Sequence, residues 1–166
     1  MTAEQARTLV EVLTGTIEQE AATTRKVIRA VTSRDYKPDP KARSAWELAT
    51  HLATSDVWFA DSIASGVFVW TGEPATPAEF TSPEAVAQWH ETTLAKELGR
   101  LRALTAEELL RPVDFFGQKA PAVTWLTLMN NHAVHHRGQL AAYLRPMGSK
   151  VPAIYGMSAD EPGQTA

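Results

Sequence analysis

The 166-residue chain has no cysteine. This absence excludes disulfide bonds, thiolate metal ligands and a cysteine nucleophile. A bound metal ion would therefore need imidazole, carboxylate or water ligands. The sequence also lacks a glycine-rich loop of the kind that cradles phosphates, which disfavours nucleotide-dependent chemistry.

Long apolar runs and basic runs are lacking too. No segment approaches the roughly 20 apolar residues needed to span a bilayer, and residues 1–7 do not have the basic-then-apolar layout of a signal peptide. The formal net charge is −3 at pH 7 and no run of Lys or Arg occurs, so we expect neither a membrane nor a nucleic acid as partner. These features predict a soluble, cytoplasmic protein with a single domain over residues 1–166.

Helical periodicity dominates the chain, and no segment alternates for long enough to predict a sheet. Apolar residues recur at three- and four-residue steps in four segments, which cover about residues 9–31, 44–66, 82–104 and 121–144. Four helices of this length predict an all-α fold, an antiparallel four-helix bundle. Residues 113–119 are expected to form a short extended or hairpin-like element, and the tail after Ser158 is expected to fray.

Three predicted helix starts have clear capping signals. Ser44 with Glu47, and Thr105 three residues before Glu108, have the spacing of a capping box. Ser82 precedes a proline at the first helical position, which is a favoured arrangement. Gly66 is a suitable stop for the second helix.

Polar residues interrupt the apolar stripes of three predicted helices. His132 and His136 are one turn apart on the last helix, about 40° from each other around its axis, so both imidazoles can chelate one divalent metal. His51 lies in the stripe of the second helix, and Thr16 and Glu20 lie in that of the first. Burying such groups without partners is costly, which favours a shared site in the core.

Other interpretations stay open at this point. A single histidine in an apolar stripe is more often a satisfied core or rim residue than a metal ligand. His135 lies about 60° from His132 on the other side, where it could compete as ligand, support the ligands or face solvent. His90, beside Trp89, is interpreted as structural or exposed. Ala133 occupies the position of the glutamate in the zinc-protease motif, and no serine-nucleophile elbow occurs, so neither protease class is indicated.

Three segments of the chain resemble a known family. They are residues 132–140 (HAVHHRGQL), continuing to Tyr143-Leu144-Arg145, residues 44–52 (SAWELATHL) and residues 151–156 (VPAIYG). Over about residues 5–160 the chain resembles the DinB superfamily, also called DinB/YfiT-like metalloenzymes. The resemblance implies a four-helix bundle of up-down-down-up topology. It also implies a divalent metal held by three histidines, which correspond here to His51, His132 and His136, with His135 outside the ligand set.

The resemblance also bears on activity. Characterised members of the family include bacillithiol transferases and the related mycothiol-dependent maleylpyruvate isomerases, which use a low-molecular-weight thiol as cosubstrate. The leading hypothesis is therefore a metal-dependent enzyme that transfers a small thiol to an electrophile or acts as a hydrolase. Zn²⁺ or Ni²⁺ is the expected metal, with Mn²⁺ and Fe²⁺ as alternatives.

Three further residues are candidates for roles in catalysis on a small-molecule substrate. Glu20 could orient a ligand or accept a proton, provided that it faces the pocket. Gln139 lies one turn beyond His136 and could support that ligand. Tyr155, in the segment after the last helix, could close the pocket.

A different class of function is the alternative. The chain could be a non-catalytic metal-binding or stress-response module that acts through association. The apolar loop residues Val67, Phe68, Val69 and Trp70 would then supply a dimer or partner surface. A homodimer is expected.

Overall fold

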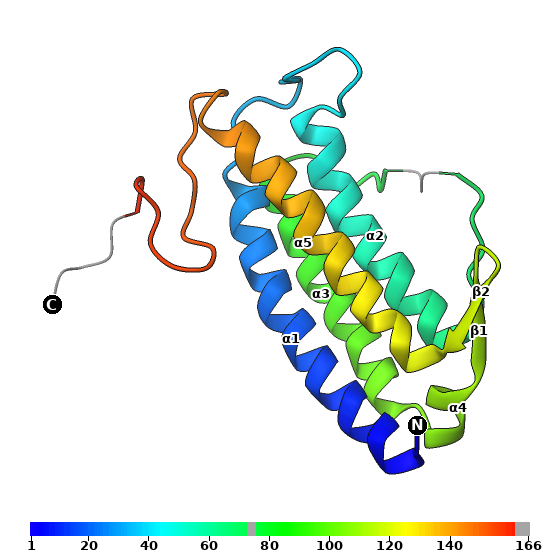
Figure 1. The fold of residues 1–166 in the computed structure, drawn as a ribbon. Helices are drawn as coiled ribbons and strands as arrows, with labels where there is room; N and C mark the ends of the chain where they lie inside the picture. Colours follow the sequence, from blue (N-terminus) through cyan, green and yellow to red (C-terminus); the bar gives the residue numbers. More distant parts are fainter. Residues whose placement is uncertain (73–75, 162–166) are drawn as a thin grey trace, which may run out of the picture.

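A computed structural model of the chain describes residues 1–72 and 76–161. The structure is mostly helical, and four long helices lie side by side (Figure 1). They are α1 (Ala3–Arg29), α2 (Ala45–Ser65), α3 (Pro83–Ala103) and α5 (Trp125–Leu144). Helices α1 and α2 each pack against both α3 and α5. Every long helix therefore contributes side chains to the interior.

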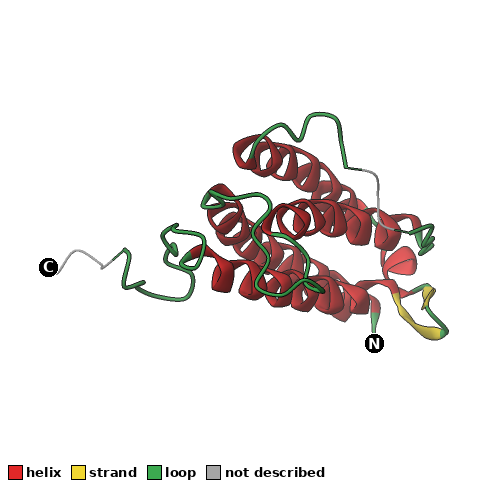
Figure 2. Cartoon of the chain, turned by 90° about the horizontal axis from the view of Figure 1, so that it is seen from above, coloured by secondary structure: helices red, strands yellow, loops and turns green. Residues whose placement is uncertain are grey.

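Short elements connect α3 to α5. The one-turn helix α4 (Ala106–Leu110) is followed by the strands β1 (Pro112–Phe115) and β2 (Gln118–Pro121) and by the 3₁₀ helix η1 (Ala122–Thr124). The strands form an antiparallel hairpin, so the predicted hairpin-like element is confirmed. Both turn residues, Phe116 and Gly117, have positive φ, the combination used by tight turns that match the twist of a hairpin. Seen from above, the hairpin and the C-terminal tail lie at opposite sides of the helices (Figure 2).

The capping residues start the helices where the sequence predicts. Ser44 Oγ accepts from the Glu47 amide at 3.1 Å, and the Glu47 carboxylate accepts from the Ser44 amide at 2.6 Å. Reciprocal caps of this kind satisfy amides that the first helical turn leaves without partners. Thr105 and Glu108 form an equivalent box at α4, and Gly66 ends α2 in the left-handed conformation with φ 82°.

The first helix differs from its prediction in extent and in its buried face. It begins at Ala3, where Thr2 and Gln5 form a capping box that the sequence reading missed. Thr16 is exposed and its hydroxyl donates to the Val12 carbonyl, so its predicted place in the core stripe is wrong. Predicted members such as Ile17 and Val27 are buried, and the buried face also includes small residues such as Ala6 and Ala21. Its members are Ala6, Val10, Thr14, Ile17, Ala21, Thr24, Val27 and Ile28.

The apolar core consists of two clusters, one toward each end of the long helices. On α1 the first cluster extends to Ala21 and the second begins at Val27. All four long helices pass from one cluster to the other through buried polar positions. We call the fully buried members of this region the polar layer: Thr24, Asp56, His90 and Arg137, each at most 1% exposed.

His90 and Asp56 form a buried pair within the polar layer. The two side chains come from α3 and α2, and His90 Nε2 lies 3.0 Å from Asp56 Oδ2. His90 is fully buried, so its interpretation as structural fits and its interpretation as exposed is wrong. The pair gives His90 Nε2 and Asp56 Oδ2 a partner in the core, whereas His90 Nδ1 and Asp56 Oδ1 have no hydrogen-bond partner among the described residues.

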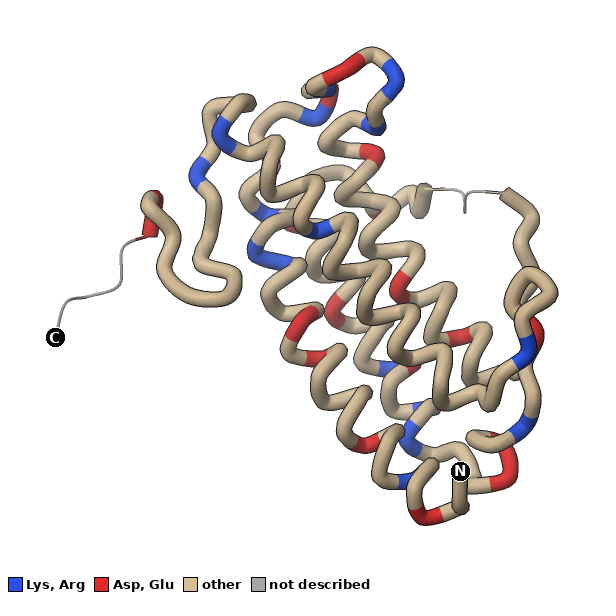
Figure 3. The backbone as a smooth tube through the Cα atoms, in the orientation of Figure 1, with Lys and Arg blue, Asp and Glu red and all other residues tan. Residues whose placement is uncertain are grey.

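Charged side chains of both signs are interleaved along the chain (Figure 3). None of the helices in the described ranges has the length and apolarity needed to cross a bilayer. The tail folds back after α5, where Asp160 accepts from the Val151 amide at 2.9 Å. The frayed end predicted after Ser158 falls partly on residues 162–166, which lie outside the described residues. The single-domain prediction for residues 1–166 stays a prediction.

The buried His90–Asp56 pair predicts a large loss of stability when one partner is removed. In Asp56→Ala, His90 stays buried without its acceptor, and we expect the free energy of unfolding in urea to fall by about 3 kcal/mol or more. Asp61→Ala is the control, because Asp61 lies on the same helix and its pair with Arg100 is exposed. We expect little change there. Equal losses in both variants would show that the buried pair is not important for stability.

Candidate metal centre

The three predicted ligand histidines meet where α2 packs against α5. His51 comes from the second turn of α2, whereas His132 and His136 occupy successive turns on one face of α5. Their ring centroids lie 5.1 Å apart for His51–His132, 4.6 Å for His51–His136 and 4.4 Å for His132–His136. One ring nitrogen from each residue can be chosen so that all three lie within 4.8 Å of one another. The three residues can therefore hold a metal ion.

One nitrogen–nitrogen contact in the group has the spacing of two ligands on one metal. The Nε2 atoms of His51 and His132 are 3.3 Å apart. Two imidazole nitrogens bound at about 2.05 Å to one tetrahedral zinc would be separated by about 3.3 Å. His132 Nδ1 is buried and has no hydrogen-bond partner among the described residues. Since Nε2 is the nitrogen at ligand spacing, Nδ1 would carry the proton and stay without an acceptor among the described residues.

His132 is held in the neutral form that metal coordination requires. Its pKa is lowered to about 4, mainly by burial and then by the neighbouring His136 and His51. The positive charge of Arg43 contributes in the same direction. A proton on this ring would be poorly solvated and close to other cationic groups, so the lone pair stays available at neutral pH.

Gln139 connects His136 to His135. Its side-chain oxygen lies 2.8 Å from His136 Nδ1, and its amide nitrogen lies 3.0 Å from His135 Nε2. The amide oxygen can only accept, so Nδ1 of His136 is the protonated nitrogen and Nε2 keeps its lone pair for a metal. His135 is exposed and is not one of the three clustered histidines. The exposure of His135 agrees with the interpretation that it faces solvent, and its contact with Gln139 connects it to His136 only indirectly.

Comparison with known proteins places the chain in a family. The DinB family model matches residues 5–165. The chain belongs to the DinB family. Most of the chain is therefore covered by the model, in agreement with the resemblance seen in the sequence.

Relatives of this DinB-family protein occur in Bacillus subtilis. YjoA is 34% identical over 119 residues, which cover 68% of this chain and 73% of YjoA. YrdA is 28% identical over 146 residues, covering 87% of this chain and 86% of YrdA. Both are uncharacterised proteins, so the similarity to them indicates no activity for this chain.

Crystal structures of DinB-like proteins have a similar fold. That of YjoA has a TM-score of 0.69 at 29% identity and covers 88% of this chain and 99% of the YjoA chain. A DinB-like protein from Bacillus cereus has a TM-score of 0.72 at 24% identity and covers 87% of this chain and 97% of its own. The helical fold is thus shared with DinB-like proteins.

Glu20 and Tyr155 lie together in a different place from that expected. They meet Arg137, a residue that the sequence reading missed, in a group that we call the Arg137 clasp. Arg137 donates to the Glu20 carboxylate at 2.5 Å, to the Glu20 carbonyl at 3.1 Å and to the Tyr155 hydroxyl. The Tyr155 hydroxyl in turn donates to Glu20 at 2.8 Å. The polar atoms of Glu20 and Tyr155 are engaged with each other and with Arg137, and neither residue belongs to the clustered histidines.

The position of Arg137 on α5 contains a signal for its burial. It falls on the line of Ala133, Leu140 and Leu144, at steps of three and four residues that face the interior. Arginine is rarely fully buried without a partner, so its place on this line points to a buried ion pair. The residue also follows His136 directly, so the clasp and the histidine group share one turn of helix.

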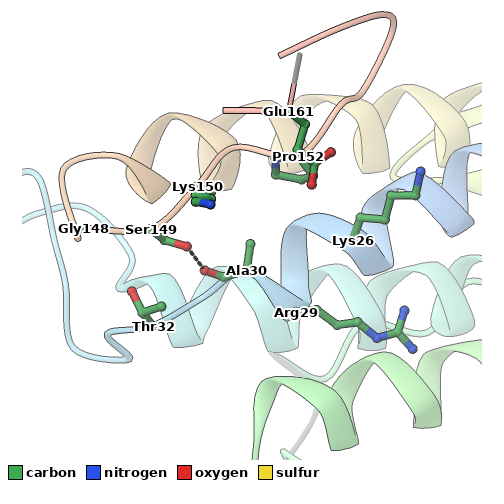
Figure 4. Close-up of a pocket in the computed structure, with 9 residues that line it drawn as sticks. All are labelled: Lys26, Arg29, Ala30, Thr32, Gly148, Ser149, Lys150, Pro152 and Glu161. Atoms are coloured by element: carbon green, nitrogen blue, oxygen red, sulfur yellow. Dashed lines mark hydrogen bonds between the residues drawn. The ribbon is translucent and has the colours of Figure 1, made fainter. Parts of the chain in front are cut away.

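A separate hollow of about 820 Å³ lies between the end of α1 and the C-terminal tail (Figure 4). None of the clustered histidines lines it. Arg29 extends from it toward α3, where it pairs with Glu84 at 2.8 Å, and the Ser149 hydroxyl donates to the Ala30 carbonyl. The charged residues that line the hollow are Lys26, Arg29, Lys150 and Glu161.

The low pKa of His132 predicts a pH dependence in the metal-free protein. Folded His132 binds its proton near pH 4, whereas an unfolded histidine does so near about 6.5. The unfolded chain therefore binds more protons between these values, and His132 makes the free energy of unfolding fall as the pH drops from about 6.5 to about 4. Nitrogen–proton NMR of the metal-free protein should give a His132 midpoint well below 6. A midpoint at or above 6.5 would contradict the burial of this ring.

Proposed function

We propose that this DinB-family protein is a metal-dependent enzyme whose divalent metal is held by His51, His132 and His136. The observation that carries the proposal is the convergence of three imidazoles from two helices, with one nitrogen of each within 4.8 Å of the others and with the His51–His132 pair at the spacing of two ligands on one ion. We propose that the reaction is transfer of a small thiol to an electrophile. Hydrolysis at the same site is the alternative. The substrate in both is a small molecule.

The donor set supports a catalytic site more than a structural one. Structural zinc sites have four protein ligands, whereas catalytic sites have three and leave a position open. Among the described residues, the group contains three histidines and no carboxylate. Imidazole ligands favour Zn²⁺ or Ni²⁺, with Mn²⁺ and Fe²⁺ as alternatives. When bound, such an ion would lower the pKa of a coordinated thiol or water molecule, so that either one could act as a nucleophile at neutral pH.

The surrounding residues would prepare the site for this chemistry. Gln139 fixes the ring of His136 so that Nε2 is the coordinating atom. The Phe59 ring lies 5.2 Å from the His132 ring and would shield that side from water. The charge of Arg43, which already disfavours a proton on His132, would favour an anionic nucleophile beside it.

The Arg137 clasp suggests a supporting role for Glu20 and Tyr155. A carboxylate that accepts from both an arginine and a tyrosine is less free to take a proton from substrate. We therefore propose that the two residues hold Arg137, and with it the turn of α5 that carries His136. Direct roles in proton transfer or pocket closure remain predictions from the sequence.

We also infer the up-down-down-up order of the four long helices. Parallel α2 and α3 require a connection that returns along the length of α2. The 21 residues of α2 extend about 32 Å, and the 17 residues between Ser65 and Pro83 can reach about 56 Å when extended. The length of this connection supports the order.

Metal content of the purified, tag-free protein tests the ligand set. We expect about one equivalent of a transition metal by mass spectrometry in the wild type, and its loss in His51→Ala, because two imidazoles bind more weakly than three. The control is His135→Ala, which removes a histidine next to His136 that lies outside the group. It should keep the metal.

The same measurement can overturn the proposal. Circular dichroism should show the same helical content in both variants, so that metal loss is not a result of unfolding. A folded wild type that holds no metal and takes up no Zn²⁺, Ni²⁺ or Mn²⁺ would exclude the metalloenzyme.

We expect that removing the Gln139 side-chain hydrogen bonds weakens metal binding even though all three histidine ligands are kept. In Gln139→Leu the His136 ring loses the acceptor that fixes its orientation, and loss of such a partner costs about 10- to 100-fold in affinity. Competition with a chromogenic chelator measures this. Unchanged affinity in Gln139→Leu would show that Gln139 has no part in holding the ligand.

One observation favours a second class of function. Val67, Val69 and Trp70 are 58%, 60% and 47% exposed, so the loop after α2 presents apolar side chains to solvent. A non-catalytic module that associates through this loop, as a homodimer or with a partner, would use them. In such a module the metal would be absent or fully coordinated by the protein and inert, whereas the metal of an enzyme should have an open position that binds small thiols.

A further inference from the structure

A continuous group of aromatic side chains leads from the histidines to the surface. Phe59 packs against His132 with a centroid distance of 5.2 Å, and it contacts Trp58 at 4.9 Å and Phe68 at 6.0 Å. Trp58 contacts Phe68 at 5.4 Å and Trp70 at 5.5 Å. We call Trp58, Phe59, Phe68 and Trp70 the aromatic wall.

The wall is held in place at its outer end. The indole nitrogen of Trp58 donates to the Val69 carbonyl at 3.1 Å, which ties the loop after α2 back onto the helix. Exposure increases along the wall, because Phe59 is 4% exposed and Trp70 is 47% exposed. One end therefore belongs to the core beside the candidate metal centre, and the other is open to solvent.

The wall has no charged member, so its surface suits a neutral, apolar group. Binding sites for small molecules are lined mainly by apolar and aromatic side chains, with a few polar groups that fix orientation. Here the histidines would supply the polar anchor and the rings the apolar surface. Aromatic rings also gain from stacked or edge-to-face contacts with another ring, beyond the area they bury.

We propose that the aromatic wall binds an aromatic or bulky apolar group of the substrate while the reacting atom lies at the three histidines. This inference rests on the proposed function, because it places the two parts of one molecule at adjoining sites. It assigns the substrate to apolar electrophiles or esters with a ring or branched chain close to the reacting atom. Trp70 is then a specificity-determining residue.

A small molecule fits the wall better than a second copy of the chain. A stable interface buries about 800 Å² on each partner, whereas the wall exposes Trp70 and the partly buried Trp58 and Phe68, next to the exposed Val67 and Val69. A partner protein would cover only this outer end. The contact between Phe59 and His132 makes the inner end continuous with the candidate metal centre, where only a small ligand would bind.

Two metal-binding probes that differ in one group test the inference. Benzohydroxamate and acetohydroxamate bind a metal through the same two oxygens and carry a phenyl ring or a methyl group. In the Co²⁺-loaded protein, titrations followed by the cobalt absorption spectrum should show that benzohydroxamate binds about tenfold more tightly, because the ring buries more apolar surface. In Trp70→Ala this preference should fall severalfold, with acetohydroxamate affinity unchanged.

Trp89→Ala is the matched control, because Trp89 lies on α3 and packs against Phe80, away from the wall. It should keep the preference for the phenyl probe. A second measurement uses the wild type alone, in which benzohydroxamate should quench tryptophan fluorescence more than acetohydroxamate does at equal metal occupancy.

The possible failures are distinguishable. If the cobalt-loaded protein binds neither hydroxamate, the open metal centre is wrong, and the proposed function fails together with this inference. If both probes bind with equal affinity in the wild type and in Trp70→Ala, the metal centre stands and the aromatic wall does not select the substrate. If Trp70→Ala keeps the preference but converts a dimer to a monomer in sedimentation, the outer end of the wall is a contact between copies and the inference is overturned.

Discussion

The buried polar layer is the constraint on which the rest of the structure depends. Four long helices enclose two apolar clusters, and between these clusters they bury Thr24, Asp56, His90 and Arg137. Burying a polar group without a partner is costly, and of these four side chains only that of Thr24 has no hydrogen-bond partner at all among the described residues. His90 takes Asp56, and Arg137 takes Glu20 and Tyr155. These pairs connect α2 to α3, and α1 to α5 and the tail, so the partners also fix how the helices sit against one another.

One turn of helix α5 contributes to the histidine group, to the Arg137 clasp and to the hydrogen bond that orients His136. It can do so because successive residues of a helix point in different directions. His136 faces α2 and the other two histidines, Arg137 faces α1 and the tail, and Gln139 bridges His136 to His135 near the surface. A rotation of the helix that broke the clasp would also move the coordinating rings. The histidine group therefore relies on contacts outside itself, as sites with fixed geometry do.

Much of this arrangement was predictable from local sequence. The spacing of His132 and His136 placed them on one face, and capping residues such as Ser44 located helix starts, because both depend on residues within a few positions of each other. The buried face of α1 was predicted less well. Val12 is 60% exposed and Thr16 is exposed, whereas Ala6 and Ala21 are buried. Which residues of a helix are buried depends on where its neighbours approach, and small residues are buried where they approach closely.

Local sequence was enough to predict four long helices, several of their caps, the absence of thiolate ligands and the histidines able to bind a metal. Each of these follows from residue type and from separations of a few residues along the chain. The packing of the helices is what brings His51 to the α5 pair, Glu20 and Tyr155 to Arg137, and Phe59 to His132. These contacts join residues up to 135 positions apart, and they depend on the packing of helices, which no local pattern specifies.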